Sequence, residues 1–293
     1  MSEYKIQNEK LILTISSKGA EKKSLVRKSD GKELLWQADP AFWGRTSPVL
    51  FPLVGNYKNL TSVYDGKEYK MTQHGFARDA EFDLAEQKEN EIRFTLKDSD
   101  ATHEKYPFAF LLTIGYVLDG DTVEVIWKVK NTDEREIFFS IGGHPAFNCN
   151  LNKSGLRFSK SGKIAEGPIT CNIIEGDGSG CLSDRQKQLE LEAGILSMSD
   201  ELFAEDALII EDNQADAVTL VDENGEDVLC VSFDSPLFGI WSPVGKHAPF
   251  VCIEPWYGRC DRCDFTGDLA EREYGNRLGT GEEFSVKYGI KVY

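Results

Sequence analysis

The sequence of 293 residues lacks the features that mark membrane-spanning and exported proteins. No run approaches the roughly 18 consecutive apolar residues that a membrane-spanning helix needs. The first residues, Met1–Gln7, also lack the apolar segment of a signal peptide. We therefore expect a soluble, cytoplasmic protein that has no membrane partner.

Basic residues are scarce relative to acidic ones. Lysine and arginine total 33, aspartate and glutamate total 49, and the formal net charge is −16. Nucleic acids and anionic membranes attract surfaces on which lysine and arginine are clustered. The charge balance therefore argues against a nucleic-acid partner, and we interpret the acidic surface as an aid to solubility.

The cysteines do not form the pattern of a disulfide framework. They number seven and are scattered, which fits a reducing compartment. Cys260 and Cys263 make a single CxxC pair, but zinc would need two further ligands and a redox pair would need a βαβ context. We favour ordinary free thiols, and the alternative is a zinc or thiol protein built on this pair.

Linkers, internal repeats and helical periodicity are also sparse. No proline- or serine-rich stretch divides the chain, and only residues 101–106 and 199–207 could hold a helical turn or two. The length would permit one large all-β domain or two ordinary domains. We expect a single domain over residues 1–293.

Period-two alternation of apolar and polar residues is what the sequence has in abundance. It is clearest over residues 91–97, 123–130 and 284–292, and Asp-Gly or Asn-Gly pairs mark turns between such runs. Alternation of this kind is typical of antiparallel strands that bury one face. The sequence therefore predicts an all-β fold, a large antiparallel sandwich of many strands.

Two of the four histidines lie in turn-forming surroundings. His74 precedes Gly75, and His144 lies between Gly142-Gly143 and Pro145. Residues 137–141 read as a buried strand, so His144 would sit at the end of a core strand, fixed by proline and by glycines that permit unusual backbone conformations. Histidine titrates near neutral pH, which makes both side chains candidates for proton transfer. The alternative for His74 is a surface or capping residue of its loop.

Glu254 is a lone carboxylate in an apolar and aromatic stretch. Burial would raise its pKa toward the range of a general base, and the alternative is an ion pair with an arginine such as Arg259. Trp256 could stack on a sugar ring or could simply pack in the core. Arg45, beside an apolar run, could bind a hydroxyl, phosphate or carboxylate, or pair with an acid.

Four motifs follow one another along the chain: Arg45 with Pro48–Pro52, then Gln73–Arg78, Gly143–Asn148 and Ile253–Gly258. Their order and spacing resemble those of the aldose 1-epimerase (galactose mutarotase-like) family, most closely its LacX-like branch, over essentially the whole chain. The resemblance implies a β-supersandwich with an open carbohydrate cleft across one sheet. It also implies interconversion of the α and β anomers of a sugar, with no metal and no other cofactor.

The same resemblance implies roles for individual residues. His144 resembles the general acid that protonates the ring oxygen, and Glu254 resembles the base that takes the proton from the C1 hydroxyl. His74 resembles a second histidine near the ring oxygen, and Arg45 resembles an arginine that holds sugar hydroxyls. Asp206 is similar to an aspartate that binds hydroxyls, although the adjacent Glu205 remains an alternative.

Departures from the family pattern leave the substrate open. Gly44 precedes Arg45 where an asparagine is usual, and Pro255-Trp256 follows the catalytic glutamate. Some members of the family act on hexose 6-phosphates, which would require cations at the cleft, with Arg78, Arg259 and Arg262 as candidates. Arg78 is therefore included among the predicted substrate-binding residues.

Two functions remain open from the sequence. The first is an aldose 1-epimerase acting on a free or phosphorylated hexose, as a monomer or homodimer. The second is a carbohydrate-binding or sugar-sensing protein that uses the same cleft without turnover. Retention of both His144 and Glu254 favours the enzyme, because binding alone does not require an acid and a base.

Overall fold

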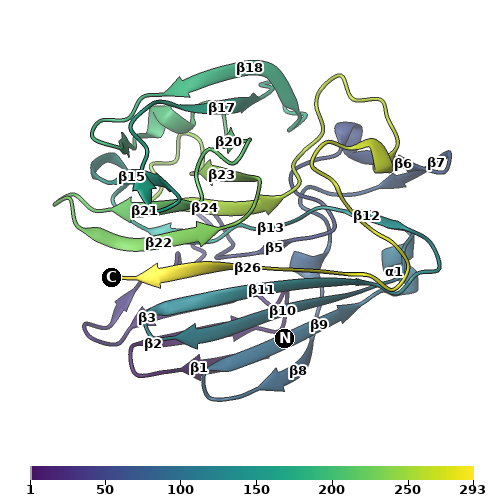
Figure 1. The fold of residues 1–293 in the computed structure, drawn as a ribbon, viewed down its shortest axis with the longest axis horizontal. Helices are drawn as coiled ribbons and strands as arrows, with labels where there is room; N and C mark the ends of the chain where they lie inside the picture. The colour runs from purple at the N-terminus through teal and green to yellow at the C-terminus, as the bar shows by residue number, and fades with distance from the viewer. Residues whose placement is uncertain (1) are drawn as a thin grey trace.

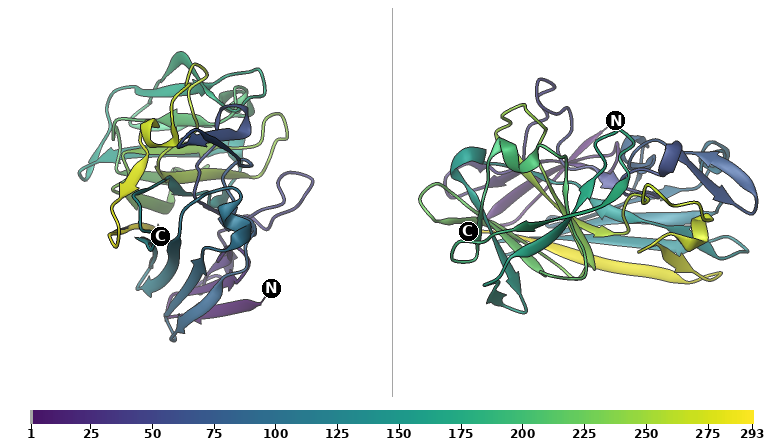
Figure 2. Two further views of the ribbon diagram at one scale, coloured as in Figure 1. Left: turned by 90° about the vertical axis from the view of Figure 1, so that its right-hand side faces the viewer. Right: turned by 90° about the horizontal axis from the view of Figure 1, so that it is seen from above.

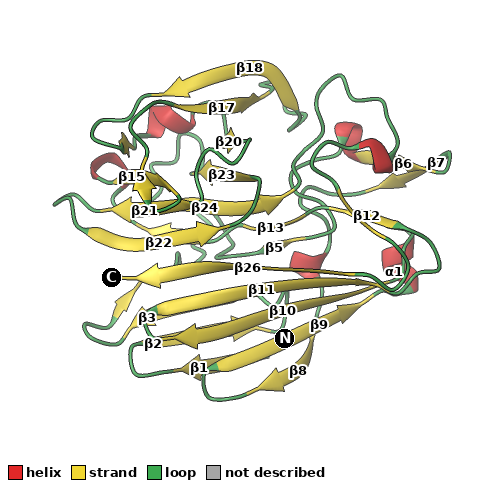
Figure 3. Cartoon of the chain, viewed as in Figure 1, coloured by secondary structure: helices red, strands yellow, loops and turns green. Residues whose placement is uncertain are grey.

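The computed structural model describes residues 2–293, and antiparallel strands dominate it (Figure 1, Figure 3). The largest sheet has ten strands in the order β16-β15-β21-β22-β26-β11-β10-β9-β8, with β19 paired to β15. Their bounds are β8 Asp83–Gln87, β9 Glu91–Lys97, β10 Phe110–Asp119, β11 Thr122–Asn131, β15 Gly155–Lys160, β16 Lys163–Ile164, β19 Ile195–Ser197, β21 Ala217–Val221, β22 Asp227–Phe233 and β26 Glu283–Val292.

A second sheet of eight strands carries the residues of the predicted site. Its order is β18-β17-β20-β23-β24-β13-β5, with β14 paired to β24. Figures 1 and 2 place β17 and β18 at the opposite end of the molecule from β8. The bounds are β5 Val49–Leu50, β13 Ile141–Gly143, β14 Ala146–Asn148, β17 Ile169–Ile174, β18 Leu182–Leu189, β20 Leu208–Ile210, β23 Leu237–Trp241 and β24 Phe250–Tyr257.

Smaller sheets and short helices complete the described chain. A four-stranded sheet has the order β1-β2-β3-β4, and β6-β7 and β12-β25 are two-stranded. Their bounds are β1 Glu3–Gln7, β2 Leu11–Ser16, β3 Lys22–Arg27, β4 Lys32–Glu33, β6 Thr61–Tyr64, β7 Lys67–Lys70, β12 Ile137–Phe139 and β25 Asn276–Leu278. The helices are α1 Asp100–His103 and the 3₁₀ turns η1 Lys58–Leu60, η2 Ala77–Asp79, η3 Leu151–Lys153, η4 Asp200–Phe203 and η5 Leu269–Glu271.

The ten-stranded sheet confirms the predicted antiparallel all-β architecture. The alternating segments at 91–97, 123–130 and 284–292 correspond to β9, β11 and β26. In β11 the inward side chains are buried, and Trp127 pairs with Ile114 of β10. Ile126, which interrupts the polar face, lies opposite Gly115, so the glycine leaves room for it.

The eight-stranded sheet differs because its central strand is covered on both faces. Seven of the eight residues of β24 are buried. One cluster of buried apolar side chains extends from Ile6 near the start of the chain to Val292 near its end. Within residues 2–293, the helices are all too short or too polar to cross a membrane.

Candidate active site

A cavity of about 260 Å³ gathers six of the seven predicted site residues: His74, Arg78, His144, Asp206, Glu254 and Trp256. The volume is below the roughly 300–1,000 Å³ of pockets for drug-sized ligands. The cavity therefore suits one small ring. Among the described residues, Arg45 is the predicted site residue that lies outside the cavity lining.

His144 enters the cavity wall directly after β13, which ends at Gly143. A Cβ on Gly142 would lie 2.6 Å from the Trp256 ring, and a Cβ on Gly143 would lie 3.0 Å from the Tyr288 hydroxyl. Both glycines belong to an extended strand. Close packing therefore explains them, and the interpretation that they provide unusual backbone conformations is wrong.

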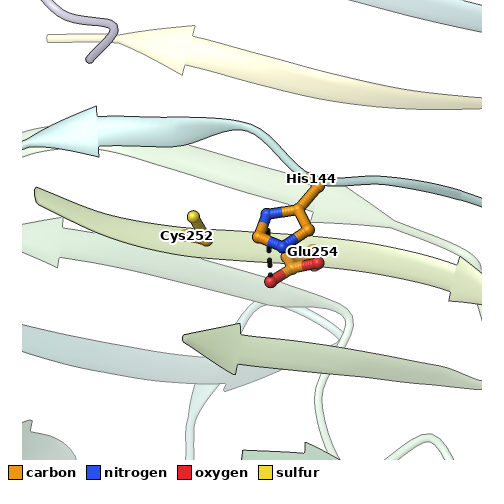
Figure 4. Close-up of side chains that lie close together, drawn as sticks. All are labelled: His144, Cys252 and Glu254. Carbon is orange, nitrogen blue, oxygen red and sulfur yellow. Dashed lines mark ion pairs between the residues drawn. The ribbon is translucent and has the colours of Figure 1, made fainter. Parts of the chain in front are cut away.

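Glu254 lies within β24 and is only 1% exposed. Its Oε1 lies 3.3 Å from Nδ1 of His144, and Figure 4 shows the Glu254 side chain on its strand facing the His144 ring on the neighbouring segment. Among residues 2–293, neither His144 Nδ1 nor Glu254 Oε2 has a hydrogen-bond partner. The fold thus brings the predicted acid and base into contact and leaves hydrogen-bonding capacity at both groups unused.

Burial controls the protonation of this pair. It raises the pKa of Glu254 well above the usual value for a glutamate. Burial, together with the charge of Arg78, lowers the pKa of His144 to about 3. Both shifts favour a neutral imidazole beside a protonated carboxyl, which contains the same number of protons as an imidazolium beside a carboxylate. A proton can therefore move between the two states without exchange with solvent.

The backbone N–H of Gly55 fixes the tautomer of His74. Its Nδ1 accepts a hydrogen bond from Gly55 N at 3.0 Å, while its own N donates to Gly55 O at 2.8 Å. The hydrogen of the neutral ring must then be on Nε2. Burial and the nearby His144 lower the pKa of His74, and the two rings meet edge to face at 5.5 Å.

The loop after His74 requires Gly75 for two reasons. Gly75 has a φ of +71°, in the left-handed region, and a Cβ there would lie 2.3 Å from Phe51 O. The same carbonyl accepts hydrogen bonds from the backbone of Phe76 and Ala77. The Gln73-to-Arg78 motif is therefore fixed against the end of β5, and this contact directs the His74 ring into the cavity.

The two predicted arginines have different surroundings. Arg78 lines the cavity, donates from Nη2 to Gln73 O at 2.7 Å, and has a pKa lowered to about 10, chiefly by burial. Arg45 donates from Nη2 to Asp79 Oδ1 at 3.0 Å, and its side chain is 30% exposed. Arg78 thus lines the cavity, whereas Arg45 lies outside its lining in an ion pair with Asp79, whose Oδ2 is also 3.9 Å from Arg78 Nε.

Asp206, and not Glu205, faces the cavity. Asp206 lines it with a left-handed φ of 74°, and its backbone N donates to Phe203 O at 3.0 Å. Glu205 instead forms an ion pair with Arg185. The structure therefore settles which of the two adjacent acids is at the cavity.

Trp256 contributes to both the wall and the core. The residue is only 4% exposed, and its ring occupies the space that a side chain on Gly239 would need, 2.4 Å from an ideal Cβ.

Arg259 does not neutralise Glu254, because it forms ion pairs with Glu211 and Glu273. Burial of Glu254 without an arginine distinguishes it from a structural ion pair.

Sequence reasoning missed the tryptophans that enclose His144. Trp43 stacks on the imidazole at 4.7 Å between ring centres, and Trp241 meets it edge-on at 5.3 Å. Trp43 lies two residues before Arg45, so its position near a motif was the available signal. Trp241 ends the apolar β23, where nothing in the sequence separates it from core. Gln73, which also lines the cavity, belonged to a motif but had no assigned role.

The same place also contains possible metal ligands. Donor atoms of His144, Cys252 and Glu254, all buried, lie within 4.8 Å of one another. The proton chemistry expected here uses the imidazole and the carboxylate only. The thiol therefore has no role in that chemistry.

Comparisons with known proteins show which family the chain resembles along its length. The family described as Aldose 1-epimerase matches residues 2–287. The plasmid-encoded protein LacX of Lactococcus lactis subsp. lactis is 32% identical over 263 residues, which cover 86% of this chain and 87% of that protein. A galactose mutarotase related enzyme from Lactobacillus acidophilus is 34% identical, with a TM-score of 0.91 and coverage of 100% and 97%.

A galactose mutarotase-like protein from Lactobacillus casei is 27% identical, with a TM-score of 0.92 and complete coverage of both chains. The match therefore extends over the whole arrangement of sheets and includes every segment that lines the cavity. The chain belongs to the aldose 1-epimerase family.

Proposed function

We propose that the chain is an aldose 1-epimerase that interconverts the α and β anomers of a free hexose. The observation that carries the proposal is the contact of 3.3 Å between His144 Nδ1 and Glu254 Oε1 in the wall of a small cavity. A sugar-binding protein needs hydrogen-bonding groups in its cleft. It does not need a desolvated acid and base without other partners.

The reaction needs one proton removed and one proton supplied. Glu254, as carboxylate, takes the proton of the C1 hydroxyl while His144, as imidazolium, protonates the ring oxygen, and the bond between C1 and the ring oxygen breaks. The C1–C2 bond of the open aldehyde rotates, and the ring closes from the other face as both protons return. Each group typically contributes about 10²–10⁴-fold to the rate.

The ionised form of the pair has to be reached from its neutral form. Because both forms contain one proton, the change is a proton transfer between neighbouring groups. Sugar hydroxyls that enter the cavity supply hydrogen bonds to the carboxylate, and hydrogen bonding favours its charged form. We therefore infer that substrate binding itself shifts the pair toward its reactive state.

The other predicted residues orient the ring. His74 presents an Nε2 hydrogen beside His144, Arg78 and Asp206 offer a donor and an acceptor for hydroxyls, and Trp256 forms a wall. Arg45 acts through its ion pair with Asp79. Holding one substrate in a reactive geometry is the remaining contribution of the protein.

The charges of the cavity favour a neutral sugar over a hexose 6-phosphate. Arg78 is the one arginine or lysine among the described residues that line it, and it shares the lining with Asp206 and Glu254. Arg259 and Arg262, the other candidate phosphate ligands, form ion pairs with acids. A phosphate would therefore meet one cation and two carboxyl groups.

Exchange NMR of anomer interconversion tests the proposal, with glucose, galactose and glucose 6-phosphate as separate substrates. We expect acceleration with a free hexose, a loss of at least about 10²-fold in Glu254→Gln, and no loss in Glu283→Gln on the surface. Acceleration with the phosphate alone would contradict the neutral substrate. Sugar binding without acceleration of any substrate would identify a sugar sensor.

A further inference from the structure

Cys252 is a buried residue beside the cavity that the proposed reaction does not use. It lies two residues before Glu254 on β24, so the two side chains share one face of the strand. Figure 4 shows the Glu254 carboxylate facing the His144 ring and the Cys252 side chain to one side of it. The Cys252 side chain is fully buried, and its sulfur, an imidazole nitrogen and a carboxylate oxygen lie within 4.8 Å of one another.

Two of these three groups have unused hydrogen-bonding atoms. His144 Nδ1 and Glu254 Oε2 are both buried without a hydrogen-bond partner among residues 2–293. The two side chains are 8% and 1% exposed. A buried polar atom without a partner is destabilising, so a ligand that bound His144 Nδ1 would relieve part of this cost.

We propose that His144, Cys252 and Glu254 bind a thiophilic divalent cation of the zinc class. Imidazole, thiolate and carboxylate are the ligands that zinc takes in proteins, at about 2.0–2.3 Å. Two donors at such distances around a tetrahedral ion lie about 3.4 Å apart, which compares with the 3.3 Å between Nδ1 and Oε1. The Cys252 sulfur lies within 4.8 Å of both donors, so it completes the set if the thiol moves toward them.

The ion would act as a reversible inhibitor, and this consequence rests on the proposed function. Metal ligands must be deprotonated. Binding therefore releases the Cys252 thiol proton and any proton that the His144–Glu254 pair holds. The bound pair then has no proton to donate to the ring oxygen and no free carboxylate to accept one.

Titration of the full chain with Co²⁺, a coloured substitute for zinc, tests the site without reference to activity. We expect one ion per chain, with visible bands of a tetrahedral ion and a thiolate charge-transfer band. Cys252→Ala should abolish the charge-transfer band, and Cys263→Ala, which removes a half-exposed thiol, should retain it. The opposite result would place the ion at the CxxC pair and overturn the proposal.

A second variant covers the case in which Cys252→Ala does not fold. His144→Asn keeps the thiol and removes a nitrogen ligand, so it should weaken Co²⁺ binding at least about tenfold. Unchanged binding in this variant would overturn the assignment.

Activity then separates the two proposals. Zn²⁺ should slow anomer exchange at least tenfold, a chelator should restore it, and Cys252→Ala should remain active while losing sensitivity to zinc. Zinc inhibition that persists in Cys252→Ala would overturn the role of the thiol. A chain that binds Co²⁺ through Cys252 but accelerates no sugar would keep this site and refute the epimerase.

Discussion

The two large sheets of this protein use their strands differently. In β11 of the ten-stranded sheet, buried and half-exposed residues alternate along the strand. In β24 of the eight-stranded sheet, seven of eight residues are buried. A strand with one solvated face can place polar residues outward without cost, whereas a polar residue in a strand like β24 is desolvated. A charged residue in β24 therefore indicates a specific role that offsets its desolvation, whereas a charged residue on the solvated face of β11 does not.

Two buried ionisable residues make the same comparison at the level of side chains. Glu254 borders the cavity, whereas Lys22 on β3 is 2% exposed and lies among aromatic rings. Lys22 Nζ donates to the Tyr288 hydroxyl at 3.2 Å and lies 5.1 Å from the centre of the Tyr116 ring. If desolvation at the cavity tunes groups for the reaction, changes at Glu254 or His144 should affect turnover. Changes at Lys22, which is not in the cavity lining, should affect stability.

The largest effect should come from the cavity. We expect His144→Gln to lower kcat for anomer exchange by about 10²–10⁴-fold, because the group that protonates the ring oxygen is lost. His103→Gln is the matched control, since His103 is 43% exposed and pairs with Asp98. The free energy of unfolding should change little in either variant. Activity of His144→Gln within threefold of wild type would remove the assigned acid.

Lys22→Met should instead stabilise the protein, in a manner that depends on pH. Burial lowers the pKa of Lys22 from 10.5 to about 7. Between these pH values the unfolded chain binds a proton at Lys22 and the folded chain does not, so the free energy of unfolding of the wild type rises with pH. Below pH 7 the wild type is destabilised by the full cost of burying this amine. The penalty is about 1.4 kcal/mol per pKa unit, or several kcal/mol in total.

Chemical denaturation at pH 6 and pH 10 measures this difference. The free energy of unfolding of Lys22→Met should exceed that of the wild type by several kcal/mol at pH 6 and by much less at pH 10. Lys128→Met on the exposed face of β11 should show no such dependence, because that side chain is 36% exposed. Equal stabilisation at both pH values would show that packing, and not desolvation of the amine, is responsible.

A smaller effect is expected from the glycine behind Trp256. Gly239→Ala places a Cβ 2.4 Å from the Trp256 ring. Overpacking of this kind typically costs about 1–3 kcal/mol, and the displaced ring should also narrow the cavity and raise KM. Gly176→Ala is the control, because a Cβ there meets nothing within 4 Å. Thermal unfolding and substrate titration of both variants measure these effects. An unchanged stability and KM in Gly239→Ala would show that the Trp256 ring can move aside without affecting either.

The smallest effect should separate two adjacent acids. Asp206→Asn should raise KM about tenfold, since a charge-assisted hydrogen bond to a hydroxyl is weakened. Glu205→Gln, which removes the partner of Arg185, should leave KM unchanged. Stability should stay within about 0.5 kcal/mol in both, because both sites are exposed. A raised KM in Glu205→Gln alone would reverse the assignment.

The predictability of the chain from its sequence follows the same division between the sheets. Alternation over residues 91–97 predicts a strand with the observed bounds of β9, because the alternation follows which face is solvated. The motifs around His74, His144 and Glu254 were located as well, and the structure brings all three side chains to one cavity.

Where both faces of a strand are buried, the alternation of apolar and polar residues disappears, and packing against distant segments determines the role of each residue. No local pattern distinguishes Trp241 from a core residue, and the two glycines before His144 are explained by Trp256 and Tyr288, each more than a hundred residues away. Arg259 could have paired with Glu254, but the fold places Glu211 and Glu273 against it. Such choices depend on long-range contacts that a local pattern does not contain.

The position of β26 has a consequence for synthesis on the ribosome. This strand, residues Glu283–Val292, lies between β22 and β11 in the middle of the ten-stranded sheet, as Figure 1 shows. The strands on either side are made earlier, so the nascent chain presents two facing unpaired edges until β26 emerges. Unpaired edges promote association between chains. We expect this sheet to close only after β26 has been made, and the growing chain to be most prone to aggregation just before it.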